Sequence, residues 1–129
     1  MAKYIPDAII DLEVAAVTGS VNKLFICSDQ PTTYTEASAA PATGYCLATI
    51  ALVGGDFTAG DGDTSGRKIT LAAQNGESVT TSGTATHYAL GASGTSTLYL
   101  VGTISSQAIV VGNLINFPAT DVLEIRDPA

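Results

Sequence analysis

The fold class is decided by residues 83–104, which read GTATHYALGASGTSTLYLVGTI. β-Branched, aromatic and small residues alternate here with a period of two on both sides of Gly91–Thr95, and this alternation is typical of strands. The two glycines of Gly91–Thr95 are expected to supply the positive φ angles of a short hairpin loop. The stretch therefore predicts a β-hairpin at the centre of the chain.

The same period of two assigns the side chains of this hairpin to faces. In the first strand it separates Thr84, Thr86, Tyr88 and Leu90 from Ala85, His87 and Ala89. In the second strand it separates Leu98, Leu100 and Ile104 from Thr97, Tyr99, Val101 and Thr103.

Outward from the hairpin, short apolar segments alternate with turn residues and predict about eight or nine strands. Residues 44–53 are apolar on both faces, which predicts a central strand. Asn75-Gly76 predicts a tight type I′ turn, and Gly112-Asn113 is expected to join a second hairpin. The remaining predicted strands are 23–28, 67–73, 78–81, 107–111, 114–117 and 122–126. We expect a mainly β fold: a single-domain antiparallel β-sandwich or small barrel with one short N-terminal α-helix.

The chain, 1–129, is predicted to be one domain. Residues 1–5 are expected to form an arm and residues 6–18 a helix that ends at Gly19. Pro6 suits the first helical position, and Asp7 places negative charge at the positive end of the helix. Two stretches, 29–43 and 56–66, are rich in small polar residues and predict loops.

The formal net charge is −7, with five basic residues and no basic patch. Binding to nucleic-acid phosphates or to an anionic membrane needs a cluster of basic side chains. Because the chain has none, we expect neither nucleic acid nor membrane as a partner. No apolar run approaches the ~20 residues of a membrane span, and the N-terminus lacks the pattern of a signal peptide. We therefore expect the chain to be made and folded in the cytoplasm.

From Ser78 to Thr120 the chain has no Asp, Glu, Lys or Arg over 43 residues. Threonine and serine hydrate a surface without charge, which is one explanation. Charge is also depleted at the centres of protein interfaces, which is the other. Composition leaves both open.

Candidate site residues are few. Cys27 is expected to share a strand face with Phe25, and Cys46 to share one with Ala48, Ile50 and Leu52. Both cysteines are interpreted as small buried apolar residues, and a disulfide between them is compatible with the sequence but not required. Tyr34 either packs its ring over the edge of the core, which is slightly favoured, or contacts another molecule.

The segment 61–66 resembles the first half of a calcium loop, in which Asp61, Asp63 and Ser65 would offer oxygens and Gly66 would turn sharply. The twelfth position is Ala72, where a bidentate glutamate should lie, so metal binding is not expected. His87 is the only histidine and lies in a predicted strand. No set of nucleophile, base and oxyanion donors can be assembled, so we expect no enzyme activity and no cofactor.

Five segments resemble a group of small virion structural proteins of tailed bacteriophages: MAKYIPDAIID, ICSDQPTTYTEA, GDGDTSGRKIT, GTATHYALG and LEIRDPA. The resemblance covers nearly the whole chain, and its motifs shape turns and strand faces without defining a chemical site. Proteins of this kind resemble capsid decoration (cement) proteins, which are small, β-rich and bound to the capsid lattice. The resemblance implies a location at the capsid surface of the virion and the major capsid protein as partner. It is also compatible with a homo-oligomer on the capsid. It carries over no site residues.

Two hypotheses for function follow. The first is a decoration protein that stabilises the capsid, with contacts expected from Ala2–Pro6, the loop around Tyr34 and the uncharged hairpins. The alternative is a binding module of the tail or fibre that recognises a host surface sugar or protein. A sugar site would need an aromatic platform, and spacing alone does not cluster the tyrosines Tyr4, Tyr34, Tyr45, Tyr88 and Tyr99.

Overall fold

The computed structural model describes residues 15, 17, 19–62 and 66–125. Within that part the fold is mainly β with antiparallel sheets, which confirms the predicted fold class. The sheets are not closed into a barrel, which leaves the sandwich-like arrangement. The elements are β1 (Lys23–Cys27), α2 (Tyr34–Ser38), β2 (Cys46–Ala51), the 3-10 turn η1 (Gly54–Asp56), β3 (Phe57–Asp61), β4 (Arg67–Leu71), β5 (Gln74–Ser78), β6 (Gly83–Ala92), β7 (Thr97–Ile109), β8 (Leu114–Phe117) and β9 (Thr120–Ile125).

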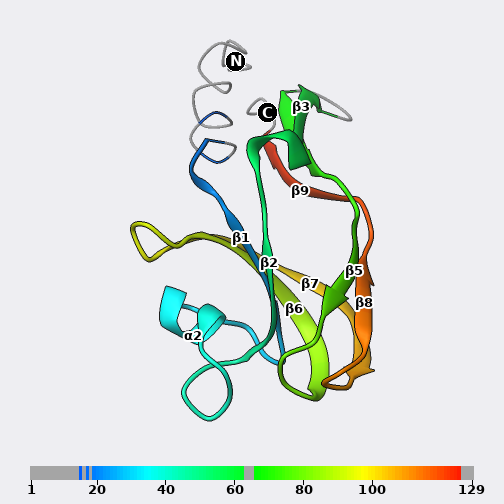
Figure 1. Ribbon diagram of the computed structural model, residues 1–129. Coiled ribbons are helices and arrows are strands. Elements are labelled where there is room, and N and C mark those ends of the chain that lie inside the picture. Colours follow the sequence, from blue (N-terminus) through cyan, green and yellow to red (C-terminus); the bar gives the residue numbers. More distant parts are fainter. Residues whose placement is uncertain (1–14, 16, 18, 63–65, 126–129) are drawn as a thin grey trace, which may run out of the picture.

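Three antiparallel sheets make up the described fold (Figure 1). The largest has the strand order β2-β1-β6-β7, the second β3-β4-β9 and the third β5-β8. In Figure 1, β5 and β8 lie side by side on one side of the large sheet, and α2 lies on the other. The large sheet therefore has both of its faces partly covered.

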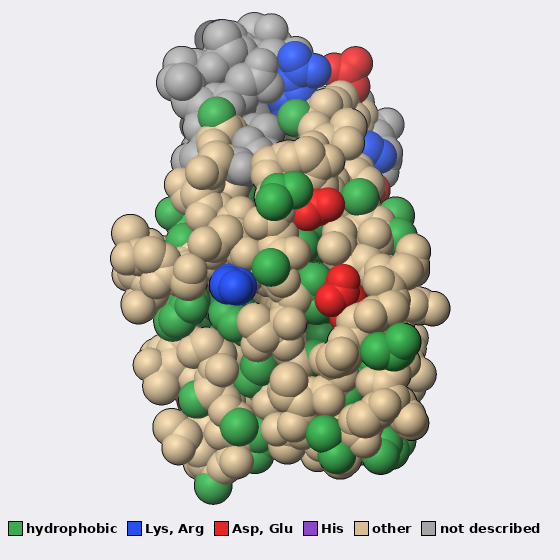
Figure 2. Space-filling view, in the orientation of Figure 1, with side chains coloured by type: hydrophobic (Ala, Val, Ile, Leu, Met, Phe, Trp, Pro, Cys, Tyr) green, Lys and Arg blue, Asp and Glu red, His purple; other side chains and the backbone are tan. Residues whose placement is uncertain are grey.

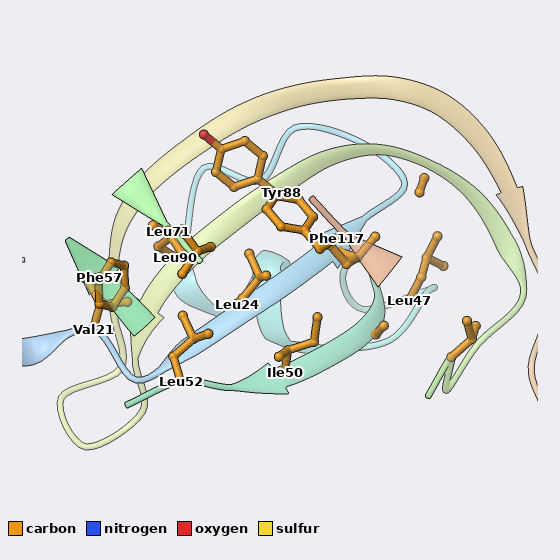
Figure 3. Close-up of a cluster of buried hydrophobic side chains, with 14 of the residues drawn as sticks. Val21, Leu24, Leu47, Ile50, Leu52, Phe57, Leu71, Tyr88, Leu90 and Phe117 are labelled. Carbon is orange, nitrogen blue, oxygen red and sulfur yellow. The ribbon is translucent and has the colours of Figure 1, made fainter. Parts of the chain in front are cut away.

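The main hydrophobic core lies between the large sheet and the smaller ones (Figure 3). Leu24 of β1, Ile69 of β4 and Leu90 of β6 are fully buried there. Burying a side chain of this size contributes about 1.5–3 kcal/mol. Tyr88 meets Phe117 edge-on, with ring centroids 5.4 Å apart and an interplanar angle of 66°, so this pair links β6 to β8.

A second, smaller core lies on the α2 side of the large sheet. It contains Phe25, Cys27, Ala37, Cys46 and Ala89. The predicted loop 29–43 is therefore wrong in part, because it contains α2, and Ala37 of that helix is fully buried. The helix begins where the Thr33 side chain accepts the Glu36 N–H, which satisfies one of the free amides of the first turn.

The central hairpin is confirmed as β6 and β7, with differences in its loop. Residues 93–96 connect the strands, and the positive φ falls on Ser96, at 51°, not on a glycine. Gly91 instead lies in β6, where an added Cβ would come within 2.9 Å of the Thr97 carbonyl oxygen. The glycine is needed there for close packing and not for its loop conformation.

The strict alternation predicted for the hairpin is wrong, because register shifts interrupt the pairing of β6 with β7 at two points. A bulge inserts extra residues, so the side chains beyond it change face. Ala85 thus joins Tyr88 in the main core, although the period placed them on opposite faces. Leu98 packs against the second core whereas Leu100 packs against the main one.

The strand predicted over 44–53 is shorter than expected, and β2 lies at the edge of the large sheet instead of its centre. Leu47, Ala48 and Ile50 of β2 belong to the main core, whereas Thr49 and Ala51 are exposed. Cys46 belongs to the second core and Ala48 to the main one, so their predicted common face is wrong. The cause is a register shift at the point where Cys27 meets Cys46. Cys27 does share its face with Phe25, as predicted.

Two further predictions fail at turns. The predicted loop 56–66 contains β3, which pairs with β4 as a hairpin. Asn75-Gly76 does not turn the chain but forms a bulge inside β5, with Gly76 at a φ of 70° and its N–H bonded to Asn116 Oδ1 at 2.9 Å. Residues 79–81 are not a strand.

The predicted hairpin of 107–111 with 114–117 is also wrong. Residues 107–109 are the end of β7, and β8 pairs with β5. The chain does turn at Gly112-Asn113, where the Asn113 N–H donates to the Val110 carbonyl oxygen at 3.1 Å. The strand that pairs with β8 is therefore β5, which is distant in sequence, and not the neighbouring β7.

The predicted arm 1–5 and most of the predicted helix 6–18 lie outside the described residues. Residues 15, 17, 19 and 20 are helical, so the helix continues past Gly19, its predicted end. Val17 is buried in the main core, and its carbonyl oxygen accepts the Val21 N–H at 3.0 Å.

Candidate interaction surface

The turn between β7 and β8 presents an apolar tip, formed by Val110, Val111 and Leu114. Their side chains are 52%, 56% and 66% exposed. The backbone of the tip is anchored, because the Val111 N–H donates to the Ser82 hydroxyl at 2.9 Å and the Val79 N–H donates to the Asn113 carbonyl at 3.2 Å. An anchored turn with apolar side chains in solvent is suited to contact with another surface.

A pocket of about 340 Å³ opens between β7 and the end of β8. It is lined by Thr103, Ile104, Ser105 and Gln107 from β7 and by Asn116, Phe117, Pro118 and Thr120. A smaller pocket, of about 120 Å³, adjoins the tip itself and shares Gln107 with the first. All of these lining residues are uncharged, so the pockets offer hydroxyl, amide and apolar groups only.

Figure 2 shows how charge is distributed over one face of the molecule. Red and blue side chains lie from the top to the middle of this view, and the bottom of the view is mostly green and tan. The strands β6, β7 and β8 come from the charge-free segment 78–120 and contribute no charged side chain to the surface. The tip and the larger pocket belong to this uncharged region.

Tyr34 packs its ring onto the protein's own core, which confirms the favoured interpretation of this residue. Its ring meets Phe25 edge-on, with centroids 5.6 Å apart and an interplanar angle of 84°. It also lies over Gly91, where an added Cβ would come within 3.2 Å of the ring. The ring is therefore half-buried against the second core.

The other described tyrosines do not gather into an exposed platform. Tyr88 is buried, Tyr45 packs half-buried against the second core, and Tyr99 is 36% exposed on β7. Tyr4 lies outside the described residues. Among the residues that the structure describes, no group of stacked, exposed aromatic rings suits a sugar.

His87 lies in β6, half-buried, as a strand residue. Its Nδ1 is 2.8 Å from the Thr86 hydroxyl, and its register partners are Cys27 and Thr103. The described neighbours of this residue therefore come from its own strand and from the two strands beside it. This geometry agrees with the structural interpretation of the residue.

Cys27 and Cys46 are both buried free thiols that face one another across β1 and β2. Burial, with a smaller effect of Cys46, raises the pKa of Cys27 from 9.0 to about 12. Burial also raises the pKa of Cys46. Reaction of a cysteine requires its thiolate, so both side chains are held in an unreactive form.

Asp61 of the half-matched calcium loop is engaged by a neighbouring cation. The Arg67 guanidinium donates to Asp61 Oδ1 at 2.6 Å across the β3–β4 hairpin. Gly66 has a φ of 71°, which confirms the sharp turn predicted there. Asp63 and Ser65 lie outside the described residues. In the described ranges no group of three or more His, Cys, Asp or Glu side chains is placed to hold a metal.

Two other carboxylates serve the fold. Hydrogen bonds from the Thr32 hydroxyl and N–H lower the pKa of Glu36 at the start of α2. The Thr70 hydroxyl and, less strongly, Lys68 lower the pKa of Asp121, which joins β4 to β9. These acids are kept ionised by local bonds, which is the opposite of what a general acid needs.

Searches of protein-family models, of curated proteins and of solved structures each found no match. Within the described residues no helix is long and apolar enough to cross a membrane.

Sequence reasoning named the uncharged hairpins as expected contacts, which includes the region of the tip, but it singled out neither the tip residues nor the larger pocket. The only available signal was the absence of charge over 78–120, which marks the region but not the residues. The pocket exists because β8 pairs with β5 and not with β7, so a space opens between β7 and β8.

Proposed function

We propose that the chain is a virion structural protein of a tailed bacteriophage that binds the major capsid protein lattice as a decoration protein. The observation that carries this proposal is the apolar tip, which is exposed at the end of a surface built from 43 consecutive uncharged residues. Exposed apolar side chains on a surface without charge are typical of the middle of a protein interface. The segment resemblance to phage virion proteins supports the same choice.

The proposed work of the protein is to cover seams between capsid subunits and to bury area there. The anchored tip would enter a recess, and the hydroxyl and amide groups of the larger pocket would satisfy polar groups of the capsid subunit around it. An interface of ~800 Å² on each partner is sufficient for a specific complex. Many copies on one lattice then stabilise the particle even if each contact is modest.

The proposal is tested by adding the purified chain to phage heads assembled without it. We expect saturable binding of on the order of hundreds of copies per head, because a lattice presents its site many times. We also expect a higher temperature of head disruption. Copy number is measured by quantitative mass spectrometry and disruption by differential scanning fluorimetry.

Two matched variants locate the contact. Leu114→Gln removes an exposed apolar side chain from the tip, and Val53→Gln does the same at Val53, which is 69% exposed between β2 and η1. Leu114→Gln should weaken head binding about tenfold or more, and Val53→Gln should leave it unchanged. Binding that neither substitution alters would place the contact away from the tip. A handful of copies per particle, or none, would overturn the decoration role and favour a tail device.

A further inference from the structure

The outer edge of β7 is open in the part of the chain that the structure describes. β7 is the last strand of the large sheet and pairs there with β6 alone. It is 13 residues long, and no charged residue or proline lies between Thr97 and Ile109. An edge strand of this kind presents a row of free N–H and C=O groups to any other strand.

Proteins usually protect such edges with lysine, proline or bulges. β7 has only the last of these, since register shifts flank an evenly paired run from Leu100 to Thr103. The bulges limit the length of a new pairing without preventing it. The larger pocket begins at Thr103 and separates β7 from residues 116–120 there, so the run from Leu100 to Thr103 is the part of the edge that we consider for a new pairing.

We propose that β7 pairs antiparallel with β7 of a second copy of this chain, across a two-fold axis near Leu100–Thr103. Two observations favour a second copy as the occupant. The best complement of an uncharged edge is an uncharged strand, and β7 is such a strand. The like charges that oppose association of two chains of net charge −7 lie outside residues 78–120, so none faces its own image in the new ladder.

A two-fold pairing is closed, because each β7 edge is used once. The pairing therefore stops at two copies and does not build a fibre. The evenly paired run is short, so we expect a weak dimer. The chain is then in a monomer–dimer equilibrium that shifts toward the dimer as the protein concentration rises. This self-pairing does not depend on the proposed capsid role, and either can fail without the other.

The test is the mass of the wild-type chain in solution, measured by size-exclusion chromatography with light scattering over about a hundredfold range of concentration. We expect the mass to rise from that of one chain toward that of two. Hydrogen exchange is measured at the lowest and the highest concentration. Backbone amides of residues 100–103 should exchange more slowly at the highest concentration. A mass that stays at one chain throughout overturns the proposal.

Thr103→Lys places a charge on the edge, and both copies of a dimer would carry it at the axis. It should keep the chain a monomer at every concentration. Thr58→Lys is the matched control, because Thr58 is exposed on β3, an edge strand of another sheet, and the change in net charge is the same. Thr58→Lys should dimerise as wild type does.

A dimer that survives Thr103→Lys, or one that both substitutions abolish, would overturn the β7 interface. If circular dichroism shows Thr103→Lys unfolded, the exchange experiment on the wild type decides. Protection gained elsewhere, and not in 100–103, would also overturn it.

Discussion

The ring of Tyr88 lies directly against the backbone of Gly102, its register partner on β7. A Cβ at Gly102 would come within 2.5 Å of Cζ and 2.6 Å of Oη of that ring. Figure 3 shows Tyr88 next to Phe117 beneath the arch of β7. The glycine thus gives the ring its place between the strand and the main core.

Gly102→Ala should therefore lower the free energy of unfolding by about 1–3 kcal/mol, because the added methyl forces Tyr88 or β7 to shift. Gly60→Ala is the control, since Gly60 is also in a strand and an added Cβ there meets nothing within 4 Å. That change should be neutral or slightly stabilising. Urea unfolding measures both. Equal stabilities of the two variants would contradict the packing of Tyr88 on Gly102.

The two thiols should resist labelling in the folded chain. At pH 8 a disulfide reagent should react slowly with Cys27 and Cys46, because both are buried with raised pKa values and little thiolate forms. The same chain in denaturant should react rapidly at both positions. Fast labelling of the folded chain, followed by absorbance of the released thiol, would show that one cysteine is accessible.

Stability should fall at alkaline pH, partly because of Cys27. Its pKa is about 12 in the folded chain and 9.0 ordinarily, so the unfolded chain loses this proton first as the pH rises. The stabilisation is complete below pH 9 and declines toward pH 12, by at most ~1.4 kcal/mol per pH unit. Burial raises the pKa of Tyr88 in the same direction. Cys27→Ala should flatten the decline measured by urea unfolding, and an unchanged slope would exclude this role.

The carboxyl of Glu36 should titrate below its ordinary pKa, because the hydroxyl and N–H of Thr32 donate to it. Any stability that it supplies is present above pH 4.5 and is lost as the pH falls through the lowered value. Thr32→Val removes the hydroxyl donor and should raise the pKa of Glu36 toward normal. Carbon-detected NMR titration measures this. Identical titration curves in the two chains would count against the hydrogen bond.

Removal of metal should have no effect on stability. EDTA is expected to leave the melting temperature unchanged, since Asp61 is paired with Arg67 and the half loop lacks its glutamate at Ala72. Differential scanning fluorimetry with and without added Ca²⁺ is the measurement. A drop of several degrees in EDTA would revive a metal site that includes Asp61.

Several local features could be predicted because they depend on neighbouring residues. The β6–β7 hairpin, β1 and the sharp turn at Gly66 follow from alternation and glycine placement within a few residues. The candidate surface could be predicted only as a charge-free segment. Its tip and pocket depend on which strand lies beside β8, and alternation does not carry that information.

The sequence by itself determined the class of fold, because period-two runs and turn residues act locally on the backbone. Only the tertiary structure decided the partners: β2 at an edge, β8 beside β5, and Asn75-Gly76 as a bulge in place of a turn. The physical reason is that a strand's hydrogen-bonding groups are alike along its length, so its partner is selected by distant side chains packing in the core. Bulges in these strands also reverse the face on which some side chains lie. Ala85 and Cys46 are each on the face opposite to the one that a strict period of two predicts.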